Sequence, residues 1–526
     1  MKLPELSATA APQFVDAASC KAWLDRVPLA NLGAAQHDLL DQLEQLNSFP
    51  TAAANRLGIM ETLRDAVNFV QIEQAKRFMN RPLPMAEADS TVFGDTIELW
   101  EQMRLGYLRC LQGALAGDAA MRAQAALITQ RLGAYVGLKM FHHHRAYREV
   151  PPRDWRSLHE AYAHAERMGV AEEGVKDFLN RDIHDTSPRI AYARAVLMGM
   201  SRPQELVQRQ LTFVAFLLER WAVKLEISQS PVVEEKGVPP LVADLAGDRC
   251  PSRSDLKAAE PRFLDTRKLA KSLRNRVGLL RKGESPAKLA LGEDCVQPSC
   301  EQLLVFLFRQ WCQLQPASPA ERGGTARVAQ ACAEVAAIHH YISGGAVRPS
   351  LDHTKLTQQQ RQELETLGRI RTTPDEEYSN VHGFLLEDWL IDEDSPQELR
   401  MRRPATAAGK RYGHGQLIAV RLAEGRGFLL GQVRWLVSAA DGELRAGIKL
   451  IPGTPAAIAL RPVGLNEKER LVYGLSLGTP PALVLPTGSF KPGRVFELPG
   501  DKPQGVRLTE LIERGADFER AAYEPA

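Results

Sequence analysis

The alternation of apolar and polar positions between Gly415 and Ile451 predicts three β-strands. In Leu444–Leu450, apolar residues alternate with Arg445 and Lys449, and a period of two is typical of half-buried strands. The dipeptide Asp441-Gly442 predicts a tight hairpin, because its residues accept positive φ angles. The middle strand is expected to place Leu429, Val433, Trp435 and Val437 on one face and Gln432 and Arg434 on the other.

Short strand-like segments fill the chain from Tyr378 onward, and glycine and proline separate them as in small β-barrels. We therefore predict an antiparallel β-barrel over residues 376–465 and a C-terminal β extension over residues 466–526. The expected strands are Gly383–Ile391, Gly415–Leu422, Gly427–Val437, Leu444–Ile451, Arg470–Leu477, Ala482–Leu485, Arg494–Leu498 and Val506–Leu508.

The preceding part of the chain is rich in strong helix formers, with leucines at helical spacing. We predict an all-α helical array over residues 1–345, with a loop at 227–259, and a linker at 346–375; the fold class is thus α+β multidomain. Ser201 is expected to cap a helix that runs to Leu225. The other expected helices are Gln36–Leu46, Asn55–Met79, Thr96–Leu115, Arg122–Tyr147, Trp155–Met168, Asp265–Lys282, Pro298–Leu314, Ala320–Tyr341 and, within the linker, Gln358–Leu367.

Composition narrows the class of protein. Because the formal net charge is only +2, a surface that binds a charged partner must be a local cluster of like charges. Seven scattered cysteines predict reduced thiols, and the first residues do not resemble a signal peptide. The most apolar long stretch, Leu211–Val223, is too short and too charged to cross a membrane. We expect a cytoplasmic protein.

Enzyme signatures are absent from the sequence. It has no phosphate loop, no nucleophile elbow and no dinucleotide fingerprint, so no catalytic residues are predicted. His159 and His164 lie five apart, which places them on different faces of a helix, and no metal site is predicted there. We expect a non-enzymatic protein without a cofactor or metal.

Three consecutive histidines, His142–His144, precede Arg145 and Arg148. Successive helical residues point about 100° apart, so these histidines cannot converge on one ion unless others such as His339 join them. One interpretation is a helix that packs one histidine and exposes the others. The alternative is a basic contact for an anionic partner of the helical array.

Two further stretches are strongly basic. Asp265–Lys282 has the pattern of a solvated amphipathic helix, and the alternative is a face that binds anions or a partner. Near the predicted barrel, guanidiniums can grip phosphates through paired hydrogen bonds. The basic residues there are Arg369, Arg371, Arg400, Arg402, Arg403, Lys410, Arg411, Arg421 and Arg426.

Three segments carry a resemblance to a known family: Trp389–Arg403 (WLIDEDSPQELRMRR), Gly415–Arg421 (GQLIAVR) and Leu429–Ile451 (LLGQVRWLVSAADGELRAGIKLI). Over about residues 365–465 the chain resembles the PilZ domain. The resemblance implies a six-stranded β-barrel that binds the bacterial messenger cyclic di-GMP. The whole layout is similar to proteobacterial cyclic di-GMP-binding effectors with a long helical region ahead of the barrel.

The family's first binding signature, Arg-x-x-x-Arg, corresponds to Arg369-Ile-Arg371, with different spacing. Its second, Asp-x-Ser-x-x-Gly, corresponds to Glu393–Glu398, which keeps Ser395, and Glu398 stands where the family has glycine. The resemblance implies that Arg369, Arg371 and Ser395 bind cyclic di-GMP, and we predict that the nearby Arg400, Arg402, Arg403 and Arg434 take part.

The leading hypothesis is a signalling protein whose barrel binds cyclic di-GMP and whose helical part engages protein partners of motility, pilus or secretion type. One alternative is an interaction scaffold with a degenerate barrel that no longer binds nucleotide. The other is a nucleic-acid-binding protein that uses the two basic stretches, although nucleic acid is not the expected partner.

Overall fold

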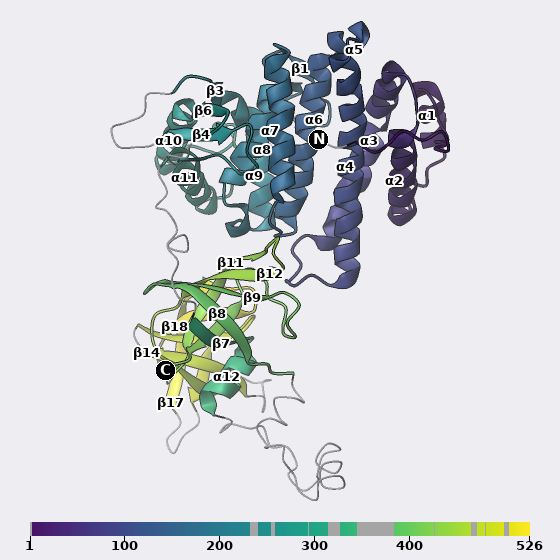
Figure 1. Ribbon diagram of the computed structural model, residues 1–526. Helices are drawn as coiled ribbons and strands as arrows, with labels where there is room; N and C mark the ends of the chain where they lie inside the picture. Colours follow the sequence, from purple (N-terminus) through teal and green to yellow (C-terminus); the bar gives the residue numbers. More distant parts are fainter. Residues whose placement is uncertain are drawn as a thin grey trace, which may run out of the picture. The chain divides into compact units, whose positions relative to one another are not determined.

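The computed structural model describes residues 3–231, 240–253, 258–292, 294–313, 327–344, 383–425, 427–463, 471–478, 480–498 and 504–526. The chain forms two units (Figure 1). The helical unit comprises Met1–Arg81 and Met85–Ala317, and the barrel unit comprises Pro82–Pro84 and Ser318–Ala526. An N-terminal helical region is thus followed by antiparallel β-barrels, which confirms the predicted fold class. Among the described residues, no helix has the length and hydropathy of a membrane span.

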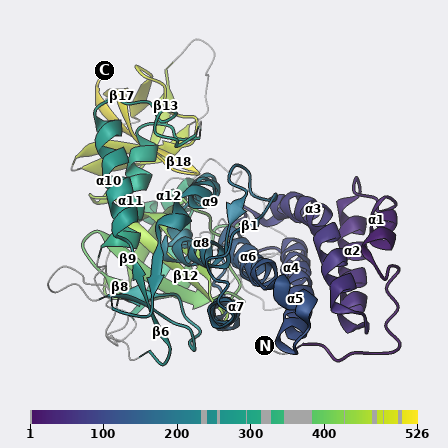
Figure 2. The same ribbon diagram turned by 90° about the horizontal axis from the view of Figure 1, so that it is seen from above.

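The helical unit is built around three long helices, α3 (Ala53–Phe78), α4 (Glu87–Leu115) and α6 (Ala125–Arg145). Helix α4 packs against both α3 and α6, as the view in Figure 2 shows. The other elements are α1 (Ala17–Leu24), α2 (Leu32–Ser48), α5 (Ala119–Ala123), α7 (Pro152–Arg167), β1 (Val175–Lys176), β2 (Asp185–Thr186), α8 (Pro188–Met200), α9 (Gln208–Trp221), β3 (Glu226–Ser228), β4 (Leu241–Asp244), β5 (Ser252–Arg253), β6 (Pro261–Asp265), α10 (Arg267–Arg281) and α11 (Ser299–Cys312), with short 3-10 turns at Pro203–Glu205 and Ala222–Lys224.

The predicted apolar stripes form the core of this unit. Leu39, Leu63, Val67, Leu99 and Trp100 are fully buried in one cluster. Each lies on the face that its helical spacing predicts, because burying such a stripe against neighbouring helices stabilises an amphipathic helix. The stripes of α2, α3 and α4 are thus confirmed.

Several local predictions for this unit are wrong. Ser201 ends α8 instead of starting the next helix, and its hydroxyl donates to the Met198 carbonyl oxygen at 2.6 Å. The predicted loop at 227–259 contains strands of an antiparallel sheet with the order β3-β6-β4-β5. Cys295 and Cys300 form a disulfide, so the prediction that all cysteines are reduced thiols does not hold.

In the barrel unit, the described strands form two closed antiparallel barrels. The first has the order β10-β11-β12-β9-β8-β7 and the second the order β13-β14-β15-β18-β17-β16. The elements are β7 (Arg327–Ala333), α12 (Val335–Ser343), β8 (Glu387–Asp394), β9 (Glu398–Pro404), β10 (Leu417–Leu422), β11 (Leu429–Ser438), β12 (Glu443–Leu450), β13 (Pro455–Pro462), β14 (Val472–Gly478), β15 (Pro481–Pro486), β16 (Val495–Leu498), β17 (Gln504–Arg514) and β18 (Phe518–Pro525).

The two barrels share a hydrophobic cluster. Leu417 and Leu430 of the first barrel and Leu475 and Phe518 of the second belong to it, and so does Ile338 of α12. A direct hydrogen bond also joins the barrels, from the Leu417 amide to the Asp517 carboxylate at 2.8 Å. The C-terminal segment is therefore a second barrel that packs against the first.

The predicted helix Ala320–Tyr341 is wrong over Arg327–Ala333, whereas helix α12 confirms its last residues. Arg327–Ala333 is strand β7, which pairs with β8 and β10 and closes the first barrel, so a barrel strand lies inside the range predicted to be all-α. The segment RVAQACA is alanine-rich and favours a helix by propensity, but Ala329 and Ala331 fill the barrel interior. Partner strands that are distant in sequence decide its conformation.

Strands β9, β13 and β18 of the two barrels were not predicted either. The predicted linker 346–375 and helix Gln358–Leu367 lie outside the described residues.

The hairpin of β11 and β12 is confirmed, with two corrections. Only Gly442 of the turn has a positive φ, 83°. The register shifts between Val433 and Trp435, so Leu436 becomes the buried residue after the shift, and Trp435 and Val437 do not continue the inner face. The Trp435 ring covers Gly447 on β12, where a Cβ atom would approach Trp435 Nε1 to 2.0 Å.

Candidate functional site

The arginines predicted to bind a ligand lie mainly on strand β9, on both of its faces. Arg400 and Arg402 are partly exposed, whereas Arg403 is buried inside the barrel. Arg400 pairs with Glu393 at 3.1 Å. Arg402 donates to Asp392 at 2.8 Å and also pairs with Glu443. The carboxylates beside this strand therefore already neutralise its outer guanidiniums.

Arg403 belongs to a buried polar network. Its side chain is only 2% exposed, and Nη2 lies 3.5 Å from Oε2 of Glu387, itself 5% exposed. Nη2 also donates to the Lys410 carbonyl oxygen at 2.9 Å. The guanidinium lies over the rings of Trp389 and Tyr412, 5.3 Å and 5.8 Å from their centroids. These contacts are those of a residue that holds the barrel end together.

The other predicted ligand residues do not join this group. Ser395 closes the β8–β9 turn, where its hydroxyl accepts from the Glu398 amide at 2.9 Å. Arg434 is exposed at the register shift of β11. Arg369, Arg371 and Arg426 lie outside the described residues. The described structure does not bring the predicted set to one place, and its role in binding stays a prediction.

The helical unit contains a cavity of about 250 Å³ that combines charge with apolar walls. Helices α3, α4, α6, α8 and α9 and the loop after β1 line it. Small residues let the facing helices α6 and α8 pack closely, since a Cβ atom on Gly137 would lie 3.4 Å from the Ala195 Cβ. We call this space the helical cavity. The charged residues that line it are Arg64, Arg145, Asp177, Arg194 and Glu219.

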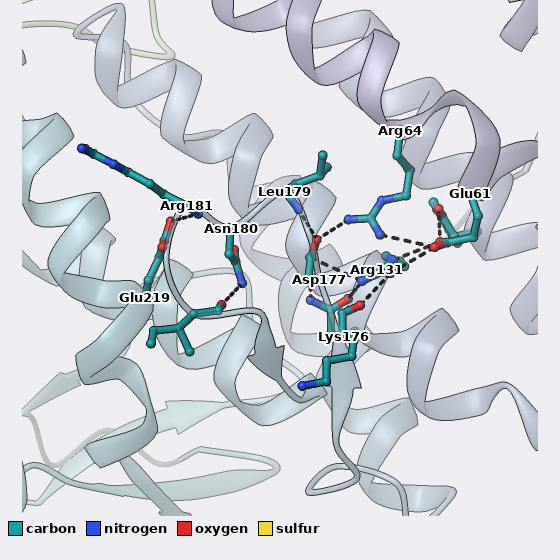
Figure 3. Close-up of polar contacts among 12 residues, drawn as sticks. Glu61, Arg64, Arg131, Lys176, Asp177, Leu179, Asn180, Arg181 and Glu219 are labelled. Carbon is teal, nitrogen blue, oxygen red and sulfur yellow. Dashed lines mark hydrogen bonds and ion pairs between the residues drawn. The ribbon is translucent and has the colours of Figure 1, made fainter.

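On one side of the helical cavity, Asp177 is held by a dense set of donors (Figure 3). Its carboxylate accepts from Arg64 at 2.5 Å and from Gln130 at 3.1 Å, and it lies 3.4 Å from Arg131. Arg131 in turn grips Glu61 with two hydrogen bonds of 3.0 Å. Burial alone would raise the pKa of Asp177, yet the two arginines outweigh it and lower that pKa below its usual value.

The loop after β1 is anchored at its other end by Glu219 of α9. The Glu219 carboxylate accepts from the amides of Arg181 at 3.3 Å and Asp182 at 3.2 Å (Figure 3). Arg194 donates to the Asn180 side chain at 2.6 Å and lies 3.8 Å from Glu219. Two carboxylates, Asp177 and Glu219, thus hold the loop that forms one wall of the helical cavity.

Arg145 differs from the other charged residues that line the helical cavity. It is the last residue of α6, where the helix dipole favours a cation. In the part of the chain that the structure describes, no carboxylate pairs with it, and its Nε is buried without a hydrogen-bond partner. Burial lowers the pKa of Arg145 to about 10. Its guanidinium lies 4.7 Å from the centroid of the Phe141 ring, which also lines the helical cavity.

Other polar atoms around the helical cavity also lack partners. Arg64 Nε and His142 Nε2 are buried without a hydrogen bond to the described residues. Burial lowers the pKa of His142 to about 3, so its ring is neutral. Because native structures rarely leave buried polar groups unpaired, such atoms around a cavity point to a polar ligand or to water. A cavity that combines the Arg64 and Arg145 guanidiniums with apolar walls can hold an anion that carries a ring.

His143, His159 and the basic helix α10 make contacts within the helical unit. His143 is buried. His159 is also buried, and its Nε2 donates to the Arg249 carbonyl oxygen while its Nδ1 accepts from the Tyr192 hydroxyl, both at 2.9 Å. The described residues contain no group of side chains that could hold a metal ion. Helix α10 buries Leu269 and Leu273 and pairs several of its cations with acids, as expected of a solvated amphipathic helix.

Comparison with known proteins identifies similarity in both units. Residues 18–232 match a family model described as the N-terminal domain of the cyclic-di-GMP receptor FimW, and residues 475–526 match a model of the FimW C-terminal β-barrel domain. The chain is 27% identical over 212 residues to the cyclic-di-GMP receptor FimW of Pseudomonas aeruginosa, which covers 40% of this chain and 35% of that protein. No solved structure matches the chain. All residues that line the helical cavity fall within the first matched range.

Proposed function

We propose that this chain is a non-enzymatic receptor for cyclic di-GMP. The observation that supports the proposal most is the match of residues 18–232 to the N-terminal domain of a protein named as a receptor for this messenger. The second match lies within the β14–β18 region of the second barrel, so the similarity extends to both units. The PilZ-like sequence of the first barrel independently favours the same ligand.

In this proposal the helical unit passes the signal to protein partners of motility, pilus or secretion type. Binding of the doubly charged messenger changes which of the unit's surfaces is available, since a ligand shifts a protein toward the state that it binds better. The ligand need only differ in affinity between the two states for this to work. The barrel arginines and Ser395 remain one predicted binding place, and the helical cavity is the other.

Isothermal titration of the purified full chain with cyclic di-GMP tests the proposal. We expect a saturable heat with a Kd of about 10 μM or tighter, which corresponds to a free energy of about −7 kcal/mol. Cyclic di-AMP is the matched control, since it has the same ring and phosphates but different bases. No heat with cyclic di-GMP at about 100 μM would refute the receptor function.

An interaction scaffold with a degenerate barrel is the second candidate. The pairing of Arg400 with Glu393 and of Arg402 with Asp392 favours it, because neutralised guanidiniums attract phosphate weakly. The scaffold predicts no heat from either cyclic dinucleotide in the same titration. It also predicts that partner binding is unchanged when cyclic di-GMP is added at about 100 μM.

A further inference from the structure

We infer that the helical cavity, and not the barrel, binds the messenger, and that it takes one nucleotide half of the ring, with Arg145 on the phosphate. The inference rests on the proposed function and assigns it a place. Cyclic di-GMP consists of two identical nucleotide halves with one negative charge on each phosphate. Size, charge and wall chemistry of the helical cavity each agree with one such half.

The size of the helical cavity limits what can enter. Its volume of about 250 Å³ lies just below the range of about 300–1,000 Å³ that is usual for sites of drug-sized ligands. A whole cyclic dinucleotide belongs to that larger class. One nucleotide half can therefore enter, while the other half stays at the mouth, where it is exposed to solvent or to a partner.

The charge balance of the lining residues favours one phosphate. Arg64, Arg145 and Arg194 carry three positive charges and Asp177 and Glu219 two negative ones, which leaves one positive charge. That charge belongs to Arg145, with which no carboxylate of the described residues pairs. Leaving a guanidinium partly buried and unpaired costs free energy, and an entering phosphate recovers it through charge-assisted hydrogen bonds.

The walls provide for the rest of a nucleotide. Ile72 of α3 lines the helical cavity and is 44% exposed, although it is a large apolar residue. Leu138 and Phe141 line it from α6. Such a wall suits the flat face of a base. The unpartnered His142 Nε2 offers a hydrogen bond to a base edge or a ribose hydroxyl.

The barrel lacks this combination. Its outer arginines on β9 already face Glu393, Asp392 and Glu443, so an entering phosphate would have to displace a carboxylate. Arg403 is buried inside the barrel, and its charge is compensated by Glu387 at 3.5 Å. Within the described residues, the helical unit offers the unneutralised guanidinium that the barrel strand does not.

Titration of matched variants of the full chain with cyclic di-GMP tests the inference. Arg145→Gln should weaken binding by about 10- to 100-fold, the loss expected for hydrogen bonds to a charged group. Arg148→Gln is the control. Arg148 also has a pKa lowered by burial and lies 4.7 Å from a ring centroid, that of Phe93, but it does not line the helical cavity. Its Kd should stay within about threefold of the wild-type value.

A second pair of variants avoids disturbing buried charges. Ile72→Glu places a carboxylate at the exposed apolar wall and should weaken binding at least about tenfold by repelling phosphate. Phe69→Glu, three residues earlier on α3, changes an equally exposed side chain that does not line the helical cavity, and should leave the Kd unchanged. Thermal melts serve to check that the two variants of each pair are equally stable.

The outcomes separate the inference from the receptor function. If wild-type protein binds cyclic di-GMP and both Arg145→Gln and Ile72→Glu bind equally well, the inference is overturned and the receptor function stands. If wild-type protein does not bind cyclic di-GMP, the receptor function fails. In that case GMP is used as the probe. Weak GMP binding that Arg145→Gln abolishes supports the helical cavity as a nucleotide site. If GMP does not bind, or binds Arg145→Gln as well as the wild type, the inference is overturned.

Discussion

Arginines gather in two regions of this chain, strand β9 of the first barrel and the helical cavity. Strand β9 has the greater density in the sequence, with Arg400, Arg402 and Arg403 in four positions. Each of the three faces a carboxylate. In the helical cavity the arginines are scattered along the sequence, and Arg145 has no such partner among the described residues.

This difference shows that the number of cations in a stretch does not measure its capacity to bind an anion. A guanidinium that is already paired must give up its carboxylate before it gains a phosphate, so the net change in free energy is small. An unpaired and partly buried guanidinium has no such bond to give up. Substitutions at neutralised and at unneutralised arginines should therefore differ in their effects on stability and on ligand binding.

The largest effect is expected at Arg403. Arg403→Leu leaves the buried Glu387 without its cation and should destabilise the barrel unit by about 3–5 kcal/mol. Hydrogen exchange measured by mass spectrometry should show faster exchange in peptides of β8 and β9. Arg400→Leu on the same strand is the control, since its side chain is partly exposed. Equal exchange in both variants would contradict a structural role for Arg403.

The helical unit should lose stability on mild acidification because its histidine run is held neutral. Burial lowers the pKa values of His142, His143 and His144 to about 3 each. Below the unfolded value of about 6.5, the unfolded chain binds protons that the folded chain does not, so the free energy of unfolding falls as pH falls. From pH 7.5 to about 5.5 the loss should be up to about 4 kcal/mol, or about 1.4 kcal/mol per histidine.

Urea unfolding followed by circular dichroism at 222 nm measures this loss at each pH. His144→Gln should reduce the difference between the two pH values by about one third, because one of the three groups no longer titrates. A free energy of unfolding that does not change over this range would show that these histidines are accessible to protons in the folded state.

A smaller effect is expected from a substitution of Asp177, the carboxylate that pairs with Arg64 on one side of the helical cavity. Asp177→Asn keeps the size of the side chain but removes the charge that holds Arg64, so cyclic di-GMP should bind about tenfold more tightly. Asp182→Asn in the same loop, where Asp182 pairs with Arg220, is the control and should not change the affinity. Titration calorimetry measures both. Weaker binding by Asp177→Asn would mean that Asp177 affects the affinity for cyclic di-GMP by holding the loop after β1 in place, and not by neutralising Arg64.

The smallest effect is expected on the outer face of the barrel. Arg400→Gln should change the free energy of unfolding by less than about 1 kcal/mol, as is usual for partly exposed ion pairs. Its affinity for cyclic di-GMP should equal that of the wild type. A loss of binding of about tenfold or more would return the binding site to the barrel residues that the sequence predicts.

Prediction from the sequence was most accurate for helices and strands that bury one face and expose the other. The leucine spacing of α2 and α4 placed Leu39, Leu99 and their neighbours in the core. The alternation in β12 placed Leu444, Ala446 and Ile448 inside the barrel. It was least informative where a partner strand decides, as for β7, whose alanines favour a helix in isolation, and for β11, whose register shift moved Leu436 to the inner face.

The candidate site shows the same limit. The sequence of the segment from His142 to Arg148 fits two interpretations, a helix that packs one histidine and exposes the others, and a basic contact for an anion. The structure buries both His142 and His143, so the interpretation with one packed histidine is wrong. Among the described residues, no carboxylate pairs with Arg145. Asp177 and Arg194 gave no signal in the sequence, because they lie far from Arg64 along the chain and meet only through the packing of α3, α6 and α8.

The sequence by itself determined that a helical region precedes antiparallel β-barrels, because hydrophobic periodicity is a local property that each element carries. Tertiary structure alone decided which charges are neutralised. A guanidinium's charge is compensated by neighbours up to about a hundred residues away, as Arg64 is by Asp177, and only folding brings such neighbours within hydrogen-bonding distance.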